Sequence, residues 1–174
     1  MINCNIDLLG HSFDTLKKNA IVVVFEKKII HTLFGTNNWQ IVIDDDCIKI
    51  INIKNEVLEI KSETLKAVEI GIVRKFLGAS IGIFLRTSIV SRIEFKHENP
   101  KDDFVILCED YQIIKKMLKW AKDNKLELID YFNLKKYAEE DRLSYINLEP
   151  NFTSDTYNDI PDKYKVIYSN AASI

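Results

Sequence analysis

The stretch of residues 102–128 constrains the fold most, because its pattern predicts a short strand joined directly to an amphipathic helix. Residues 104–108 are apolar, and residues 109 to about 124 follow with apolar side chains at helical spacing. Glu109 and Asp110 lie at the expected N-terminus and lysines gather toward the C-terminus, as the helix macrodipole favours. The expected buried stripe comprises Ile113, Ile114, Met117, Leu118 and Ala121, with Trp120 on its flank. Such a helix needs a sheet or a second helix to cover the stripe.

The residues before this stretch have the pattern of a sheet. From residue 38 onward, short apolar or alternating segments are separated by turn residues such as Asp44, Asp45 and Asp46. The seven expected strands cover residues 39–43, 47–53, 56–61, 65–73, about 81–87, 89–97 and 104–108. The sequence therefore predicts a mainly β, α+β domain over residues 38–128.

This order of elements resembles the pleckstrin-homology-like fold. In that family a bent, seven-stranded antiparallel partial barrel is capped by a C-terminal amphipathic helix, and a tryptophan of the helix packs into the barrel. Trp120 stands at the corresponding place. The resemblance is one of architecture over about residues 38–128, and the bias toward Ile, Lys and Asn makes the chain most similar to bacterial members. It implies a partial barrel capped by the helix.

Two segments flank this domain, residues 1–37 and residues 129–174. Residues 1–37 are expected to form an N-terminal lead packed on the domain, with a helix preferred because Phe13, Leu16, Ala20 and Val23 share a helical face. Residues 21–25 fit a buried strand equally well. Residues 129–174 hold six of the seven tyrosines, and we expect either a strap over exposed sheet surface or a mobile partner-binding tail. A short helix at 134–142 and a strand at 163–168 are expected within it.

Composition and length point to one cytoplasmic domain. The chain has 174 residues and a net charge of -2, so no global basic field favours nucleic acid. Cys4, Cys47 and Cys108 are odd in number and far apart, as is typical of reduced thiols. The N-terminus lacks the positive start of a signal peptide. Residues 76–85 form the longest uncharged apolar run, which is too short to span a membrane.

The sequence contains one motif that is typical of catalysis, but the residues around the motif argue against a catalytic role. Residues 78–82 match Gly-x-Ser-x-Gly, the turn that exposes a nucleophilic serine in many hydrolases. That turn requires a helix after Ser80, whereas the following residues have a strand pattern. His97 is the only later histidine, and Glu94 is the only carboxylate between it and the motif. A small serine hydrolase using Ser80 is therefore the least favoured of three hypotheses.

Metal and cofactor sites are not expected. His11, His31 and His97 are scattered, without a ligand partner at helical or hairpin spacing. The three aspartates at 44–46 lack the spacing and glycine of an EF-hand, so they predict a solvated hairpin turn. They would also repel the phosphate head group that many pleckstrin-homology domains bind at this loop. Neither standard glycine-rich phosphate loop is present.

The leading hypothesis is a non-enzymatic module that binds another protein. Phosphotyrosine-binding relatives of the resembled fold take a peptide as an added strand between the fifth strand and the C-terminal helix. The corresponding groove here would be formed by Ile83, Leu85, Arg86, Thr87, Ile114 and Leu118.

The alternative hypothesis is binding to an anionic lipid or membrane surface. It would use the basic residues Arg74, Lys75, Arg86 and Arg92, provided that they share a face. Their plainer interpretation is a solvated face of the sheet.

Overall fold

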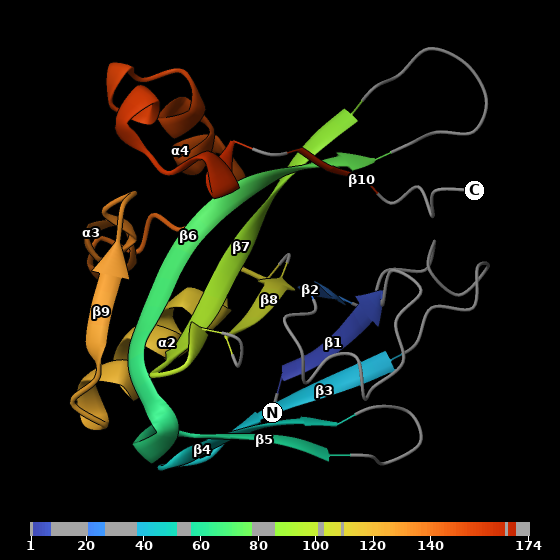
Figure 1. The fold of residues 1–174 in the computed structure, drawn as a ribbon. Helices are drawn as coiled ribbons and strands as arrows, with labels where there is room; N and C mark the ends of the chain where they lie inside the picture. The colour runs from blue at the N-terminus through green and yellow to red at the C-terminus, as the bar shows by residue number, and fades with distance from the viewer. Residues whose placement is uncertain are drawn as a thin grey trace.

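The computed structural model describes residues 2–7, 21–26, 38–51, 57–77, 86–100, 103–108, 110–165 and 167–169 (Figure 1). These residues form an α+β fold around a mixed sheet with the strand order β10-β6-β7-β8-β2-β1-β3-β4-β5, and β9 pairs with β6. The strands are β1 Ile2–Asp7, β2 Ile21–Glu26, β3 Asn38–Ile43, β4 Cys47–Ile51, β5 Val57–Lys61, β6 Leu65–Leu77, β7 Arg86–His97, β8 Phe104–Cys108, β9 Glu127–Asp130 and β10 Ile167–Ser169. The α-helices are α2 Gln112–Asp123, α3 Leu134–Glu139 and α4 Tyr145–Leu148, and the 3-10 helices are η2 Ser62–Thr64, η4 Glu149–Phe152, η5 Asp155–Asp159 and η6 Asp162–Tyr164.

Five of the seven expected strands correspond to β3, β4, β5, β6 and β8, with ends shifted by a few residues. The two expected strands at 81–87 and 89–97 differ from the structure, because β7 runs through Ser88 without a break. Ser88 pairs with Lys75 of β6, so the ladder continues where two separate strands were expected. The remainder of the expected fifth strand, residues 81–85, lies outside the described residues.

The sheet is mixed, which corrects the expectation of a purely antiparallel barrel. Strands β3-β4-β5 and β6-β7-β8 are antiparallel as expected, but β1 and β2 lie between the two groups, and β2 pairs with β8 in parallel. Strands β9 and β10 also pair in parallel with β6. Among the described strands the path runs openly from β10 to β5, without a pairing that closes a barrel.

Helix α2 connects two strands that run in the same direction. Strand β7 is antiparallel to both β6 and β8, and β9 is parallel to β6, so β8 and β9 share one direction. Parallel strands need a crossover, and a helix usually provides it. Helix α2 is therefore a β-α-β crossover rather than the last element of the fold, because β9 follows it directly.

The N-terminal segment contributes two strands to the centre of the sheet. Strand β2 occupies Ile21–Glu26, so the preferred helix is wrong there and the strand alternative is correct. The run Ile-Val-Val-Val is β-branched, which lowers helix propensity and favours strands. Residues 8–20 and 27–37, including the rest of the expected helical face, lie outside the described part of the chain.

Helix α2 covers one face of the β6–β7 pair. It begins at Gln112, three residues later than expected, and the Asp110 carboxylate accepts a hydrogen bond from the Gln112 backbone N–H at 2.8 Å. Ile113, Ile114 and Met117 are fully buried. Trp120, expected on the flank, is also buried and its ring meets that of Phe95 edge-on at 6.5 Å. Leu118 is only half-buried.

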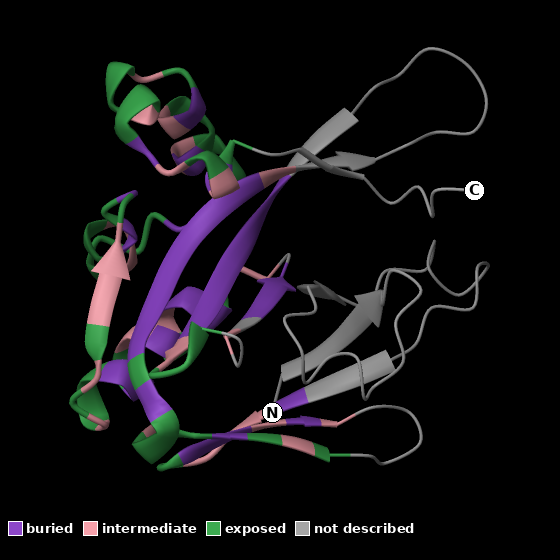
Figure 2. Cartoon of the chain, in the orientation of Figure 1, coloured by how far each residue is buried: buried purple, intermediate pink, exposed green. Residues whose placement is uncertain are grey.

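The C-terminal segment covers the opposite face of the same strand pair. Tyr164 of η6 is fully buried, and its ring lies so close to Gly71 of β6 that a Cβ atom there would be 2.1 Å from Cε1. Side chains alternate along a strand, so Gly71 and its neighbour Ile70 face opposite sides of the sheet. Figure 2 shows β6 and β7 buried along most of their described length, since both faces are covered.

The same segment also follows the outer edge of β6 through β9 and β10 (Figure 1). Helix α3 begins where expected, because the Asp130 carboxylate accepts hydrogen bonds from the N–H groups of Leu134 and Lys135, both at 2.9 Å. It ends at Glu139 rather than 142. Phe132, Phe152, Tyr157 and Tyr164 form a chain of ring contacts between these elements.

Candidate functional site

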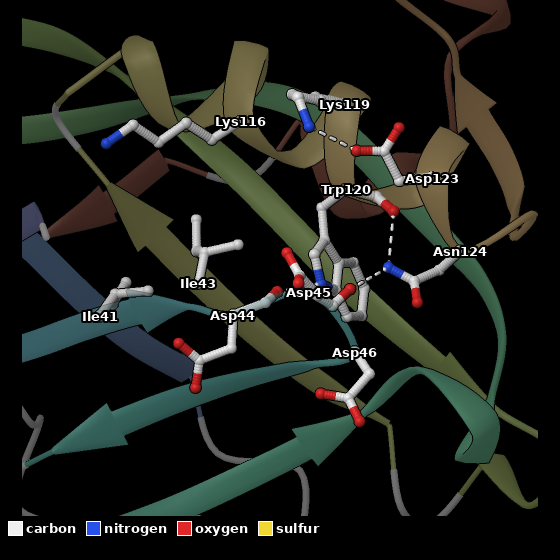
Figure 3. A pocket seen from close by; sticks show the side chains of 10 residues that line it. All are labelled: Ile41, Ile43, Asp44, Asp45, Asp46, Lys116, Lys119, Trp120, Asp123 and Asn124. Atoms are coloured by element: carbon white, nitrogen blue, oxygen red, sulfur yellow. Dashed lines mark hydrogen bonds and ion pairs between the residues drawn. The ribbon is translucent and has the colours of Figure 1, made fainter.

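A pocket lies between the β3–β4 turn and the C-terminal half of α2 (Figure 3). Its volume is about 560 Å³. Strand β3 contributes Ile41 and Ile43, and the helix contributes the indole of Trp120, so the floor is apolar. Polar side chains surround the floor: Asp44, Asp45, Asp46, Lys116, Lys119, Asp123 and Asn124.

Hydrogen bonds hold the turn of Asp44, Asp45 and Asp46, which we call the Asp turn, against α2. The indole Nε1 of Trp120 donates to the backbone carbonyl of Asp44 at 3.0 Å. The Nδ2 of Asn124 donates to the carbonyl of Asp45 at 2.8 Å. Figure 3 shows both side chains reaching from the helix to the turn. These two bonds fix the position of the Asp turn relative to α2.

The rim of the pocket is acidic. Four aspartates and two lysines line it, which gives a net charge of -2. Asp44 pairs with Lys49 at 2.7 Å, and this hydrogen bond lowers the pKa of the Asp44 carboxyl. Lys119 pairs with Asp123 at 2.5 Å.

Two of these carboxylates are available for a ligand. Asp45 and Asp46 are exposed, and neither forms an ion pair within the described part of the chain.

A cysteine thiol lies next to the Asp turn. The Sγ of Cys47 lies 3.7 Å from Oδ2 of Asp44. Burial raises the pKa of this thiol, so the reactive thiolate is disfavoured. The described lining residues include no histidine to act as a general base.

Four residues of the expected groove on the fifth strand are described: Arg86, Thr87, Ile114 and Leu118. Ile114 lies on the buried face of α2 and is fully buried, so a docked partner cannot contact it. Arg86 and Thr87 lie in β7, paired with Leu77 and Phe76 of β6.

Three residues of the earlier hypotheses, Ile83, Leu85 and Ser80, lie outside the described residues. Leu118 is half-buried and lines a second cavity, between α2, β9 and α3.

The four basic residues of the alternative hypothesis do not form one exposed face. Arg92 is 6% exposed, donates to Glu94 at 2.5 Å and stacks over the ring of Tyr164 at 5.3 Å. Arg74 is half-buried, with its guanidinium 4.8 Å from the ring centre of Phe152. Lys75 and Arg86 are placed in β6 and β7 by their backbones, and their side chains lie outside the description.

Arg92 belongs instead to a buried ionic cluster that the sequence analysis missed. Lys163 of η6 bridges Glu69 at 2.6 Å and Glu94 at 2.9 Å, and the Tyr164 hydroxyl donates to Glu69 at 2.6 Å. Lys96 also contacts Glu94. The available signal was a carboxylate between two apolar residues in each strand: Glu69 between Val68 and Ile70, and Glu94 between Ile93 and Phe95.

Hydrogen bonds and nearby cations set the ionisation of this cluster. Burial disfavours the Glu94 carboxylate, but hydrogen bonds from Lys96 and Arg92 outweigh it and hold the pKa of Glu94 at about 2. Burial and the hydrogen bond to Glu69 raise the pKa of Tyr164, so the phenol remains protonated. The cluster is therefore a network of opposite charges that joins the C-terminal segment to β6 and β7.

The described residues contain no group of three or more His, Cys, Asp or Glu side chains arranged to hold a metal ion. Among the same residues, no helix has the length and apolarity needed to cross a membrane. No protein-family model matches the chain, and no curated protein is detectably similar to it in sequence.

Proposed function

We propose that the protein is a non-enzymatic interaction module, and that the pocket beside the Asp turn accepts a basic side chain of a partner protein. The observation that carries the proposal is an apolar floor combined with a net acidic rim. A lysine or arginine matches both features, because its methylene groups contact apolar surface while its charged end reaches carboxylates. Asp45 and Asp46 supply those carboxylates, since Asp44 and Asp123 are already paired.

The pocket is large enough for the basic side chain of the partner together with the residue next to it. A volume of about 560 Å³ lies in the range of pockets that bind small ligands, roughly 300–1,000 Å³. It exceeds what one long side chain fills. An apolar residue next to the basic one would occupy the remaining space over Ile43 and Trp120 (Figure 3).

The fixed geometry of the pocket favours affinity. The bonds from Trp120 and Asn124 to the Asp turn order the site in advance, so little conformational entropy is lost on binding. The alternative of an anionic lipid surface has less support, because Arg92 is buried and paired with Glu94. The acidic rim would also repel an anionic surface at the pocket itself.

Selection of random peptides displayed against the immobilised protein tests the proposal. We expect enrichment of Lys or Arg next to an apolar residue. A selected peptide should shift the indole N–H resonance of Trp120 in an NMR titration, because the indole lines the pocket. Selection without a basic preference, or shifts that avoid Trp120, would contradict the proposal.

A matched pair of variants isolates the charge of the pocket. Asp45→Asn with Asp46→Asn should weaken binding of the selected peptide roughly 2- to 30-fold, since each exposed ion pair contributes about 0.2–1 kcal/mol. Asp155→Asn with Asp159→Asn changes the net charge equally at two exposed positions of η5. Equal loss of affinity in both double variants would show that only net charge acts.

A further inference from the structure

The second cavity is a groove on the other side of α2, between α2, β9 and α3. Its volume is about 670 Å³. Its floor is apolar and is formed by Leu118, Ala121, Leu126, Leu128 and Ala138. Apart from Ala121, these side chains are only half-buried by the rest of the chain.

The rim of this groove has the opposite sign to that of the pocket. Four lysines, at positions 115, 119, 122 and 135, stand against Asp123 and Glu139, which gives a net charge of +2. Lys115 pairs with Asp141, and Lys119 with Asp123. Lys122 and Lys135 are exposed and form no ion pair with any described residue.

The shape of the groove fits a helix. Its lining runs along α2 from Lys115 to Asp123, which is about 12 Å at 1.5 Å per residue. Helix α3 forms the opposite wall through Lys135, Ala138 and Glu139, which lie on one helical face. Two helical walls with an apolar floor between them match the ridge of a third helix.

We propose that this groove binds an acidic amphipathic helix of a partner protein. The apolar stripe of that helix would cover Leu118, Leu128 and Ala138, as in other complexes where a helix lies in a hydrophobic groove. Its acidic flanks would meet Lys122 and Lys135. The site is separate from the pocket at the Asp turn, although both have the Lys119–Asp123 pair on their rims.

The test uses synthetic peptides and the ¹⁵N-labelled full chain. The probe is a helix of about four turns with leucine at helical spacing and glutamate elsewhere. One comparison peptide replaces each glutamate with lysine, a second scrambles the leucine spacing, and a third carries a central proline. We expect the acidic amphipathic probe to shift the amide resonances of Leu118, Leu128 and Ala138, with at least about tenfold weaker binding of each comparison peptide.

Charge reversal in the groove gives the second measurement. Lys122→Glu with Lys135→Glu should weaken binding of the probe at least about tenfold, and binding should also weaken as salt rises from about 0.05 to 0.5 M. Lys61→Glu with Lys66→Glu is the matched control, because both lysines are exposed and do not line the groove. Circular dichroism confirms that each variant folds.

Three results would overturn the proposal. The first is equal binding of the lysine or scrambled peptide, which would indicate non-specific contact. The second is equal binding of the proline peptide, which would indicate an extended occupant. The third is equal loss in the groove variant and its control. Asp45→Asn with Asp46→Asn leaves the groove lysines intact, so failure of the pocket proposal and failure of this one are distinguishable.

Discussion

Replacing Gly71 with alanine tests how the C-terminal segment is held on the sheet. The added Cβ would lie 2.1 Å from Cε1, 2.6 Å from Cζ and 2.8 Å from the hydroxyl of Tyr164, all well inside van der Waals contact. The ring has little freedom to move away. Its hydroxyl is bonded to Glu69 at 2.6 Å, and the ring of Phe132 packs against it at 5.2 Å.

The magnitude follows from the two ways in which the clash can be relieved. A shift of the ring in place combines overpacking of about 1–3 kcal/mol with loss of a hydrogen bond to a carboxylate, about 1.5–3 kcal/mol. Complete release of Tyr164 exposes about 150–250 Å² at roughly 25 cal/mol per Å², or about 4–6 kcal/mol. We therefore expect Gly71→Ala to lower the free energy of unfolding by about 3–5 kcal/mol.

Urea denaturation followed by circular dichroism measures this change, with Tyr164→Leu as the matched background. Leucine lacks the three clashing atoms, so Gly71→Ala should cost less than about 1 kcal/mol when position 164 is leucine. A loss below about 1 kcal/mol in the wild-type background would refute the close contact between Tyr164 and β6. Equal losses in the two backgrounds would show that the effect of alanine arises elsewhere.

Two further predictions concern the ionic cluster and the pocket. The pKa of Glu94 is about 2 in the folded protein against an ordinary 4.5, so its contribution to stability is fully present above pH 4.5 and is lost as pH falls toward 2. Urea midpoints across that range should fall less steeply for Glu94→Gln than for the wild type, and equal slopes would contradict the assignment. Trp120→Phe removes the donor to the Asp44 carbonyl and should lower the free energy of unfolding by about 1–3 kcal/mol. Thermal denaturation measures this loss, and an unchanged melting temperature would contradict the prediction.

The local elements of the fold were largely determined by the sequence. The periodicity of residues 113–121 predicted α2, and the acidic residue Asp110 does lie against its first turn. Alternation and turn residues predicted β3, β4, β5, β6 and β8 to within a few residues. These features depend on contacts between near neighbours, which the sequence records directly.

The arrangement of those elements was decided by the tertiary structure. The N-terminal strands lie between β8 and β3, and the C-terminal segment supplies parallel partners to β6. No local sequence pattern specifies either pairing. Tyr164 and Glu69 are 95 residues apart in the chain and meet only when the C-terminal segment covers β6 and β7. A buried carboxylate is stable there because the same packing brings Lys163 to it.

The candidate site was likewise predicted in part by the sequence and completed by the tertiary structure. The sequence identified the Asp turn and Trp120 as separate features, and it marked Leu118 on α2 as a contact residue. The sequence did not predict that Trp120 donates to a carbonyl 76 residues away. It also did not predict that Leu118 lies beside β9 and α3 rather than beside β7. Helical or strand periodicity determines which face of an element is apolar. Which surface covers that face, and which pockets remain between the elements, depends on packing across the whole chain.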